Sequence, residues 1–352
     1  MTINKPVLTI DFTGMDRRNF IKQSAAAGAL LGLQNVPIGS NSDQNEKVIR
    51  IGIIGLDTSH SPEFTKFFNS GNPDESAKGF RVVAAYPRGS EDIQSSIEKI
   101  PEYTQQVQGM GVEIVDSIKA LLKKTDAILL ETNDGRPHLE QAREVFKTGK
   151  PVFVDKPVTA SLTDAVKMFR EAKEKKISIF SSSALRYLNN AQAVRNENKI
   201  GRVLGADAFS PASLEPHHPD LFWYGIHGVE ILYTVMGTGC DTVTRFQTTD
   251  TEFVVGKWKD GRIGTFRGTR TGTHDYGGIA FGTEGNLVLG TFEGYDNLLV
   301  KIAEFFKTGI SPVDPAETLE IYGFMEAADE SKRRGGIPVS VDEVLKKAGY
   351  QG

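Results

Sequence analysis

Lys156 stands where a side chain commonly takes part in catalysis. It follows a short apolar run, residues 151–154, and precedes Pro157. Proline disfavours the helical conformation of the residue before it, so Lys156 is expected in an extended segment at the carboxyl end of a strand. In doubly wound folds ligands bind at that edge of the sheet. A lysine there can hold a reacting oxygen or lower the pKa of a hydroxyl group; a surface lysine after a strand is the alternative interpretation.

His227 is a second candidate, because an imidazole with an ordinary pKa near 6.5 exchanges protons at neutral pH. The pattern predicts a helix over residues 225–236, which places Glu230 on the same face as His227. Trp223, four residues earlier, offers an aromatic surface of the kind on which sugars stack. A hydrogen-bonded histidine between domains is the alternative interpretation.

Residues 215–220 add His217 and His218 between two carboxylates. Imidazoles and carboxylates are metal ligands. The spacing fits no metal motif, however, and adjacent residues of a strand point to opposite faces. We therefore predict that this stretch lines a substrate pocket, and no metal site is assigned.

A strand, a turn and a helix at residues 48–68 would position these side chains. Residues 48–54 form a β-branched run typical of a buried parallel strand, and Gly55 ends it. Ser61 is predicted to cap the helix, with Pro62 in its first turn. A dinucleotide-binding domain begins in this way, but Asp57 and His60 occupy the second and third glycine positions of its fingerprint.

The replacement of glycine by Asp57 bears on the cofactor. A carboxylate about 4 Å from a phosphate charge would repel it by about 4 kcal/mol if the effective dielectric constant is about 20. Asp57 could instead act as a built-in anion at the helix N-terminus. After the second strand, Arg88 and Ser90 stand where an NAD site has an acidic residue. They would suit a 2′-phosphate and hence NADP.

The order of elements indicates an α/β fold with a doubly wound parallel sheet. Up to Ser183 strands alternate with helices, and strands are predicted at 48–54, 80–86, 111–115, 127–130, 151–154 and 177–180. The second half predicts a large, mostly antiparallel open sheet, with strands at 243–248, 252–258, 263–269, 279–283 and 287–291. Predicted helices lie at 93–100, 116–124 (capped by Asp116), 137–147, 162–175, 188–199, 225–236, 298–307 and 316–333.

We divide the chain into an export signal with a linker (1–46), a Rossmann domain (47–183) and a substrate and oligomerisation domain (184–352). Asp16-Arg17-Arg18-Asn19-Phe20-Ile21-Lys22 precedes a short run of small and apolar residues. It resembles a twin-arginine export signal and predicts a periplasmic or otherwise exported protein; an amphipathic arm is the alternative. The net charge of -4 gives no indication of a basic surface that would bind nucleic acid. With a single cysteine, an intrachain disulfide is impossible.

Several motifs together resemble the Gfo/Idh/MocA oxidoreductases, named for glucose–fructose oxidoreductase and inositol dehydrogenase. The resemblance covers residues 48–348 and is carried by Glu131-Thr132-Asn133 with His138, by residues 149–157, 225–230 and 281–285, and by the closing helix ending at 327–331. It implies a Rossmann domain and a C-terminal open-sheet domain, with the substrate between them.

The resemblance also implies roles for individual residues. In the family, the lysine matched by Lys156 touches the substrate hydroxyl and the nicotinamide, and the histidine matched by His227 is the general acid and base. Trp223 stands where the family has a carboxylate, which removes the proton-relay partner. Expected cofactor contacts are Gly55, Asp57, Thr58, Ser59, His60, Arg88, Thr132, Asn133, His138 and Lys156. Expected substrate contacts are Lys156, Arg186, His217, Trp223, Tyr224 and His227.

These features predict an exported oxidoreductase that acts on a hydroxyl group of a sugar, sugar acid or cyclitol. Because the twin-arginine route carries folded proteins, a tightly bound NAD or NADP could travel with the chain. The alternatives are a degenerate member that binds carbohydrate without a dinucleotide, and an NAD-assisted glycoside hydrolase or lyase. The export machinery is an expected partner, and a homo-oligomer through the second sheet is expected because relatives use that face.

Overall fold

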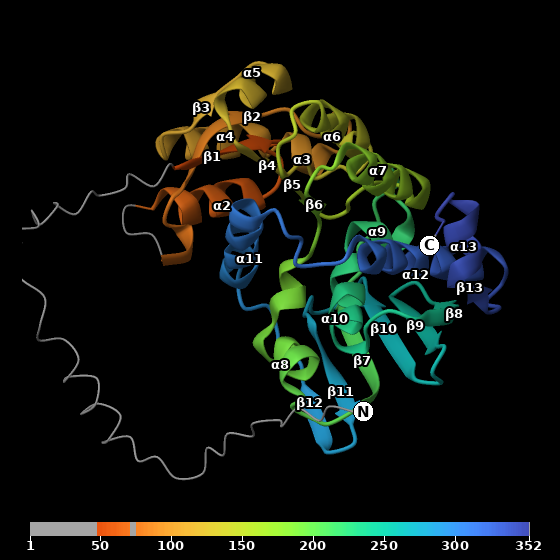
Figure 1. The fold of residues 1–352 in the computed structure, drawn as a ribbon. Coiled ribbons are helices and arrows are strands. Elements are labelled where there is room, and N and C mark those ends of the chain that lie inside the picture. The colour runs from red at the N-terminus through yellow and green to blue at the C-terminus, as the bar shows by residue number, and fades with distance from the viewer. Residues whose placement is uncertain (1–47, 71–74, 352) are drawn as a thin grey trace, which may run out of the picture. The chain divides into compact units, whose positions relative to one another are not determined.

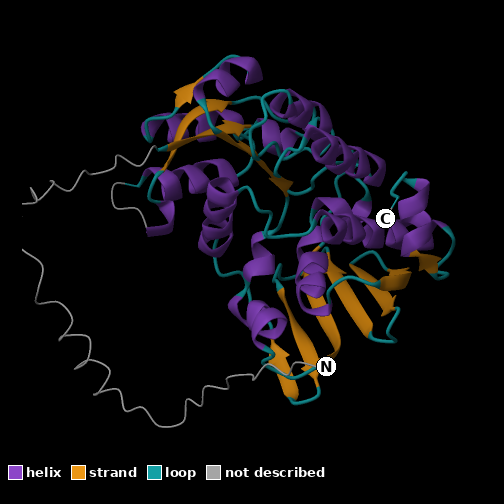
Figure 2. Cartoon of the chain, in the orientation of Figure 1, coloured by secondary structure: helices purple, strands orange, loops and turns teal. Residues whose placement is uncertain are grey.

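A computed structural model describes residues 48–70 and 75–351. These residues form two sheets, and helices pack against both (Figure 1; Figure 2). The export-signal prediction falls on residues outside the described ones. Within the described ranges, the search for a helix long and apolar enough to cross a membrane finds none.

The first sheet has six parallel strands in the order β3-β2-β1-β4-β5-β6. Its central strands are almost wholly apolar and buried, as expected when helices cover both faces. The strand order reverses between β1 and β4, so a crevice for ligands opens at their carboxyl ends. The strands are β1 (Ile49–Ile54), β2 (Phe80–Tyr86), β3 (Glu113–Ile114), β4 (Ala127–Leu130), β5 (Val152–Val154) and β6 (Ile179–Phe180).

Helical crossovers join these strands, because parallel neighbours cannot be linked by tight turns. They are α2 (His60–Asn69), η1 (Glu75–Ala77), α3 (Gln94–Ile97), α4 (Ile100–Gly109), α5 (Ile118–Lys124), α6 (His138–Phe146) and α7 (Leu162–Lys175). A helix from much later in the chain, α11 (Asp296–Thr308), also packs here and lies beside α2 (Figure 1). Its Phe305 ring lies 4.8 Å from the ring of Phe180, within the buried cluster that includes β1 and β5.

The second sheet has seven strands in the order β12-β11-β7-β10-β9-β8-β13. Only β7 and β10 run parallel among its paired strands in the described residues; the others pair antiparallel. The fold-class prediction is therefore confirmed. The strands are β7 (Val203–Pro211), β8 (Cys240–Gln247), β9 (Thr251–Trp258), β10 (Ile263–Thr269), β11 (Gly277–Gly282), β12 (Gly285–Val288) and β13 (Val339–Ser340).

Helices cover one face of this sheet, and the central one, α10 (Ile226–Met236), is buried at every position. Strands β7 and β10 contact it on one side and helices α8 and α12 on others. The remaining helices are η2 (Ala184–Tyr187), α8 (Asn189–Glu197), α9 (Asp220–Trp223), α12 (Pro315–Arg333) and α13 (Val341–Lys347). Phe209, Ile263 and Ile279 are exposed apolar residues on β7, β10 and β11.

The structure corrects several local predictions. Helix α2 begins at His60, so Ser61 is not its cap; the Ser61 hydroxyl donates to the Gly55 carbonyl at 2.9 Å. Helix α5 is capped by Ser117, whose hydroxyl accepts from the Ala120 N–H, and not by Asp116. Strand β7 was missed because the run 203–211 mixes small, polar and apolar residues without a clear period.

Candidate active site

A pocket of about 340 Å³ lies where the ends of the first sheet meet α9 and the start of α10. It brings together residues predicted for cofactor and substrate from several elements. The predicted residues that line it are Asp57, Thr58, Ser59, His60, Asn133, Lys156, Trp223, Tyr224 and His227. Its size suits a small molecule.

Lys156 enters the pocket from the segment that follows β5 and is 9% exposed. Its Nζ lies 3.6 Å from Asp155 Oδ2. Burial, the largest single influence, lowers the pKa of Lys156, but the surrounding acidic and phenolic groups, Asp155 foremost, together outweigh it, so the pKa of Lys156 lies above its ordinary value. Lys156 is therefore a cation at neutral pH in the wall of the pocket.

His227 enters the pocket from the first turn of α10. Its Nδ1 lies 2.7 Å from Ser183 Oγ, just after β6, which fixes the ring and leaves Nε2 for a ligand. Burial, followed by the cations Lys156 and His60, holds the pKa of His227 well below its ordinary value. A buried, neutral imidazole beside a lysine is suited to accept a proton from a hydroxyl group.

Glu230 does not support His227 as the helical spacing suggested. It accepts hydrogen bonds from Ser182 at 3.1 Å and from Arg186 at 2.5 Å. Trp223, at the end of α9, lines the pocket as predicted, and its ring lies 4.9 Å from that of His218. The rings of Tyr224 and Tyr276 stand edge-on to His227 at 5.8 and 5.6 Å.

Asp57 lies in the turn between β1 and α2 and is 2% exposed. Its carboxylate accepts the backbone N–H of Ser90 at 2.8 Å, the Ser90 hydroxyl at 3.1 Å and the backbone N–H of Asn133 at 3.0 Å. It thus bridges the turn to the ends of β2 and β4. A Cβ at Gly89 would collide with this carboxylate, so the loop after β2 closes tightly on it.

The residues at this turn do not fit a dinucleotide in the usual Rossmann position. Gly55 keeps the first fingerprint role, since its φ is +92° and a Cβ there would lie 2.5 Å from the Thr132 backbone. The pyrophosphate, however, needs backbone N–H groups and space across the turn. Asp57 already uses N–H groups from both neighbouring strand ends, and His60 reaches over the ends of β4 and β5.

The remaining predicted residues do not line this pocket. His138 is buried and contacts the carbonyl oxygens of Thr132 at 2.6 Å and Val158 at 3.2 Å. Arg186 is buried in ion pairs with Glu230 and Glu317. The others, Arg88 and Thr132, contribute no lining atoms.

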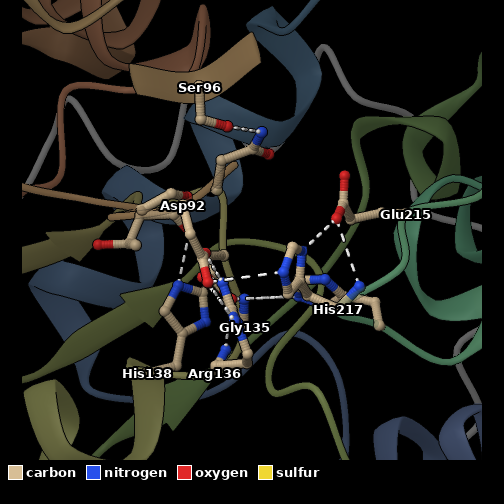
Figure 3. Close-up of polar contacts among 12 residues, drawn as sticks. Asp92, Ser96, Gly135, Arg136, His138, Glu215 and His217 are labelled. Carbon is tan, nitrogen blue, oxygen red and sulfur yellow. Dashed lines mark hydrogen bonds and ion pairs between the residues drawn. The ribbon is translucent and has the colours of Figure 1, made fainter. Parts of the chain in front are cut away.

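His217 lies outside the pocket, in a polar network beside it. Its Nδ1 contacts Glu215 at 2.6 Å and its Nε2 lies 3.5 Å from Asp92 (Figure 3). Arg136 contacts the same Asp92 and also Asp134. His217 is exposed and its neighbours are charged, so the arrangement is that of a surface ion-pair network.

Sequence reasoning missed part of the pocket wall. Tyr295, Phe292, Tyr103, Lys99 and Ser95 line it, although their positions in the sequence are far apart. It also gave no chemical role to Glu131 and Asp155, which contact His60 beneath the pocket. The sequence did hold a clue to their proximity: each follows a buried strand, and the carboxyl ends of neighbouring parallel strands lie at the same edge of the sheet.

Known proteins resemble both the Rossmann domain and the whole fold. A family model described as an oxidoreductase family with an NAD-binding Rossmann fold matches residues 49–182. The 1,5-anhydro-D-fructose reductase of Ensifer adhaerens is 29% identical over 130 residues, which are 36% of this chain and 38% of the reductase. This match supports the predicted NAD-binding type of Rossmann domain over residues 49–182.

Solved structures show the fold over most of the chain. One is scyllo-inositol dehydrogenase from Lactobacillus casei with bound NAD(H) and scyllo-inositol; the TM-score is 0.66, the identity 15%, and the coverage 84% of this chain and 100% of that one. Another is myo-inositol 2-dehydrogenase from Lactobacillus plantarum, with a TM-score of 0.67, 16% identity, and coverage of 84% and 99%. At such identities the likeness establishes architecture, while the chemistry depends on the site.

Proposed function

We propose that this chain is an enzyme of the Gfo/Idh/MocA type that acts on a hydroxyl group of a sugar, sugar acid or cyclitol, with Lys156 and His227 at the reaction centre. One observation carries the proposal. A lysine after β5 and a histidine of α10, distant in sequence, line the same pocket. The cyclitols named for the structural relatives and the aromatic wall of the pocket support the substrate class.

The two residues have complementary tasks in this proposal. The Lys156 ammonium group holds the substrate oxygen and stabilises negative charge as it develops. The neutral His227 takes the hydroxyl proton, and Ser183 keeps its ring in place. Trp223, Tyr224 and Tyr276 give apolar surfaces against which a sugar ring can rest.

Oxidation in this family needs a nicotinamide, which would require Asp57 to release Ser90 and Asn133. A second candidate function, carbohydrate binding without a dinucleotide, is favoured by those same hydrogen bonds. Mass spectrometry of nucleotide released from the purified protein distinguishes the two chemistries. Retained NAD or NADP supports the redox form, whereas its absence together with no turnover of any polyol supports the binding protein.

Replacing Lys156 tests the reaction centre directly. Lys156→Met should lower turnover of a substrate found by screening by about 10²–10³-fold, because it removes the charge that stabilises the reacting oxygen. Lys99→Met is the matched control, since Lys99 also lines the pocket but is a largely exposed side chain. Turnover that survives in Lys156→Met would contradict the assigned role.

Export remains a proposal that stands on Arg17 and Arg18. Changing both to lysine should leave the protein in the cytoplasm if the twin-arginine route carries it, and fractionation of cells measures this. An unchanged distribution would contradict the proposal.

A homo-oligomer through the second sheet is likewise proposed. Phe209, Ile263 and Ile279 are 38%, 54% and 39% exposed on neighbouring strands, which gives the sheet an apolar patch that a second copy can cover. Ile263→Asp should reduce the mass measured by light scattering to that of one chain. A monomeric wild type would overturn the proposal.

A further inference from the structure

Three side chains with metal-ligating atoms converge beneath the pocket. His60 is the first residue of α2, Glu131 directly follows β4 and Asp155 directly follows β5. Strands β4 and β5 are parallel neighbours, so the two carboxylates emerge at the same edge. His60 Nδ1 lies 2.9 Å from Asp155 Oδ2 and 3.6 Å from Glu131 Oε2. One ligand atom from each residue lies within 4.8 Å of the other two.

These distances suit ligands of one ion. Bonds of about 2.0–2.2 Å to imidazole nitrogen and carboxylate oxygen, in tetrahedral geometry, place ligand atoms roughly 3.3–3.6 Å apart. The contact between His60 and Glu131 lies in that range, and the contact between His60 and Asp155 is shorter. Binding an ion would therefore require the imidazole to move away from Asp155.

The three groups are buried and their polar atoms are not satisfied. Glu131 and Asp155 are both 0% exposed, and His60 is 7% exposed. Apart from their contacts with His60 and Lys156, the oxygens of both carboxylates have no hydrogen-bond partner among the described residues. Buried polar atoms of this kind are rarely left without partners unless a ligand completes them.

The charges of the site leave a place for a cation. Two carboxylates face one permanent cation, Lys156, whose Nζ lies 3.6 Å from Asp155. A proton on His60 would balance the charge in the absence of an ion. A divalent ion with neutral His60 would leave one net positive charge, which favours an anionic substrate such as a sugar acid.

We propose that His60, Glu131 and Asp155 bind a divalent first-row transition metal ion at the base of the pocket. One nitrogen and two oxygen ligands suit Mn²⁺ or Zn²⁺. His60 and Lys156 both line the pocket, so the ion can reach a bound substrate from this side. The ion would lie near the ends of β4 and β5, where His60 already occupies space that a dinucleotide would need. The choice of a sugar acid rests on the proposed function, whereas the metal site does not.

Equilibrium binding to the full chain tests the site. After dialysis against a chelator, calorimetric titration with Mn²⁺ and with Zn²⁺ should show one ion bound per chain. Glu131→Gln keeps the side-chain volume and removes one charged ligand, so affinity should fall about tenfold or more. Glu215→Gln is the matched control, because Glu215 also contacts a histidine, His217, but lies outside the cluster. Its affinity should equal that of the wild type.

Lys156→Met gives an independent signature. It removes the cation that competes beside Asp155, so ion affinity should rise while turnover falls. Turnover that survives together with tighter ion binding would contradict the proposed function alone, whereas lost turnover with unchanged or weaker ion binding would contradict the metal site alone. Asp155→Asn serves as a second ligand variant, with circular dichroism to confirm folding, and it too should weaken binding.

The proposal is overturned if the wild type takes up no ion at neutral pH, or if Glu131→Gln and Glu215→Gln bind equally well. An anomalous-scattering peak among the three side chains in a crystal grown with Mn²⁺ would support it. A peak elsewhere, with none here, would overturn it.

Discussion

At the scale of single residues, reactivity in the pocket depends on which groups are charged. Lys156 is kept as a cation by Asp155, and His227 is kept neutral by burial and by nearby positive charge. This division of an acid partner and a base partner follows from the environment and not from residue type. The same histidine on an exposed helix would titrate near pH 6.5.

The depressed pKa of His227 predicts the pH profile. In the proposed function the neutral imidazole of His227 is the base, so kcat/KM should be constant down to pH 6.5 and fall only at lower pH, as His227 gains a proton. The groups facing it are Lys156, His60 and Asp155, together with Ser183. The measurement is the pH dependence of kcat/KM with an identified substrate.

Two variants check this assignment. His227→Asn should lower kcat/KM by about 10²–10⁴-fold. His217→Asn should leave it close to wild type, because His217 is exposed and outside the pocket. An acid limb centred at or above pH 6.5 would contradict the prediction.

At the scale of elements, the turn between β1 and α2 decides what the Rossmann crevice can hold. In a dinucleotide site this turn offers backbone N–H groups to the pyrophosphate. Here Asp57 contacts groups at the ends of β2 and β4, and holds three segments together. The turn therefore serves as an internal brace, at the position where a dinucleotide-binding Rossmann domain receives a pyrophosphate.

Asp57→Gly should open the crevice. It restores the second fingerprint glycine and removes a carboxylate whose repulsion of phosphate is about 4 kcal/mol at 4 Å with an effective dielectric constant near 20. Affinity for NAD or NADP, measured calorimetrically, should rise by about tenfold or more. The free energy of unfolding, measured in urea, should fall by about 1–3 kcal/mol, because the Ser90 and Asn133 N–H groups lose their acceptor.

Asp57→Asn separates charge from volume and should give a smaller gain in affinity. Asp92→Gly, at an exposed aspartate near the same loop, should give none. A wild type that already binds the dinucleotide as tightly as Asp57→Gly would disprove this view of the turn.

At the scale of the whole molecule, a buried ion network connects the pocket to the second domain. Arg186 of η2 pairs with Glu230 of α10 at 2.5 Å and with Glu317 of α12 at 2.8 Å. Arg195 of α8 also contacts Glu317 at 2.8 Å. The network fixes η2, and with it Ser183 and the orientation of His227.

The ion pairs of Glu317 should make the stability of the fold depend on pH. Burial raises the pKa of Glu317, but Arg186 and Arg195 together lower it by more, so the folded-state value lies below the unfolded one. The stabilisation is therefore present above the unfolded pKa of about 4.3 and is lost as pH falls through the folded value. At pH 7 the free energy of unfolding of the Glu317→Gln variant should be about 3 kcal/mol lower than that of the wild type.

Urea unfolding at pH 7 and at pH 4 measures this effect. The difference between Glu317→Gln and wild type should shrink at pH 4. Glu304→Gln, in an exposed pair with Lys301, should change stability little at either pH. A difference that grows as pH falls would contradict the sign.

The sequence by itself determined the alternation of strands and helices and the residues that end the strands. Runs such as β2, β4 and α7 were predicted to the residue, because apolar periodicity and caps are local signals. Lys156, Trp223 and His227 were also predicted as pocket residues, since their motifs are short and sit at element ends.

Only the tertiary structure decided which groups meet. The anchoring of α11 on the first sheet, the contacts of Asp57 with Ser90 and Asn133, and the convergence of His60 with Glu131 and Asp155 all join segments far apart in the chain. Arg186 and His138 carried the same motif signals as Lys156, yet packing turned them into buried structural contacts. Sequence patterns report which face of an element is buried, whereas the partner across that face depends on how the elements pack together.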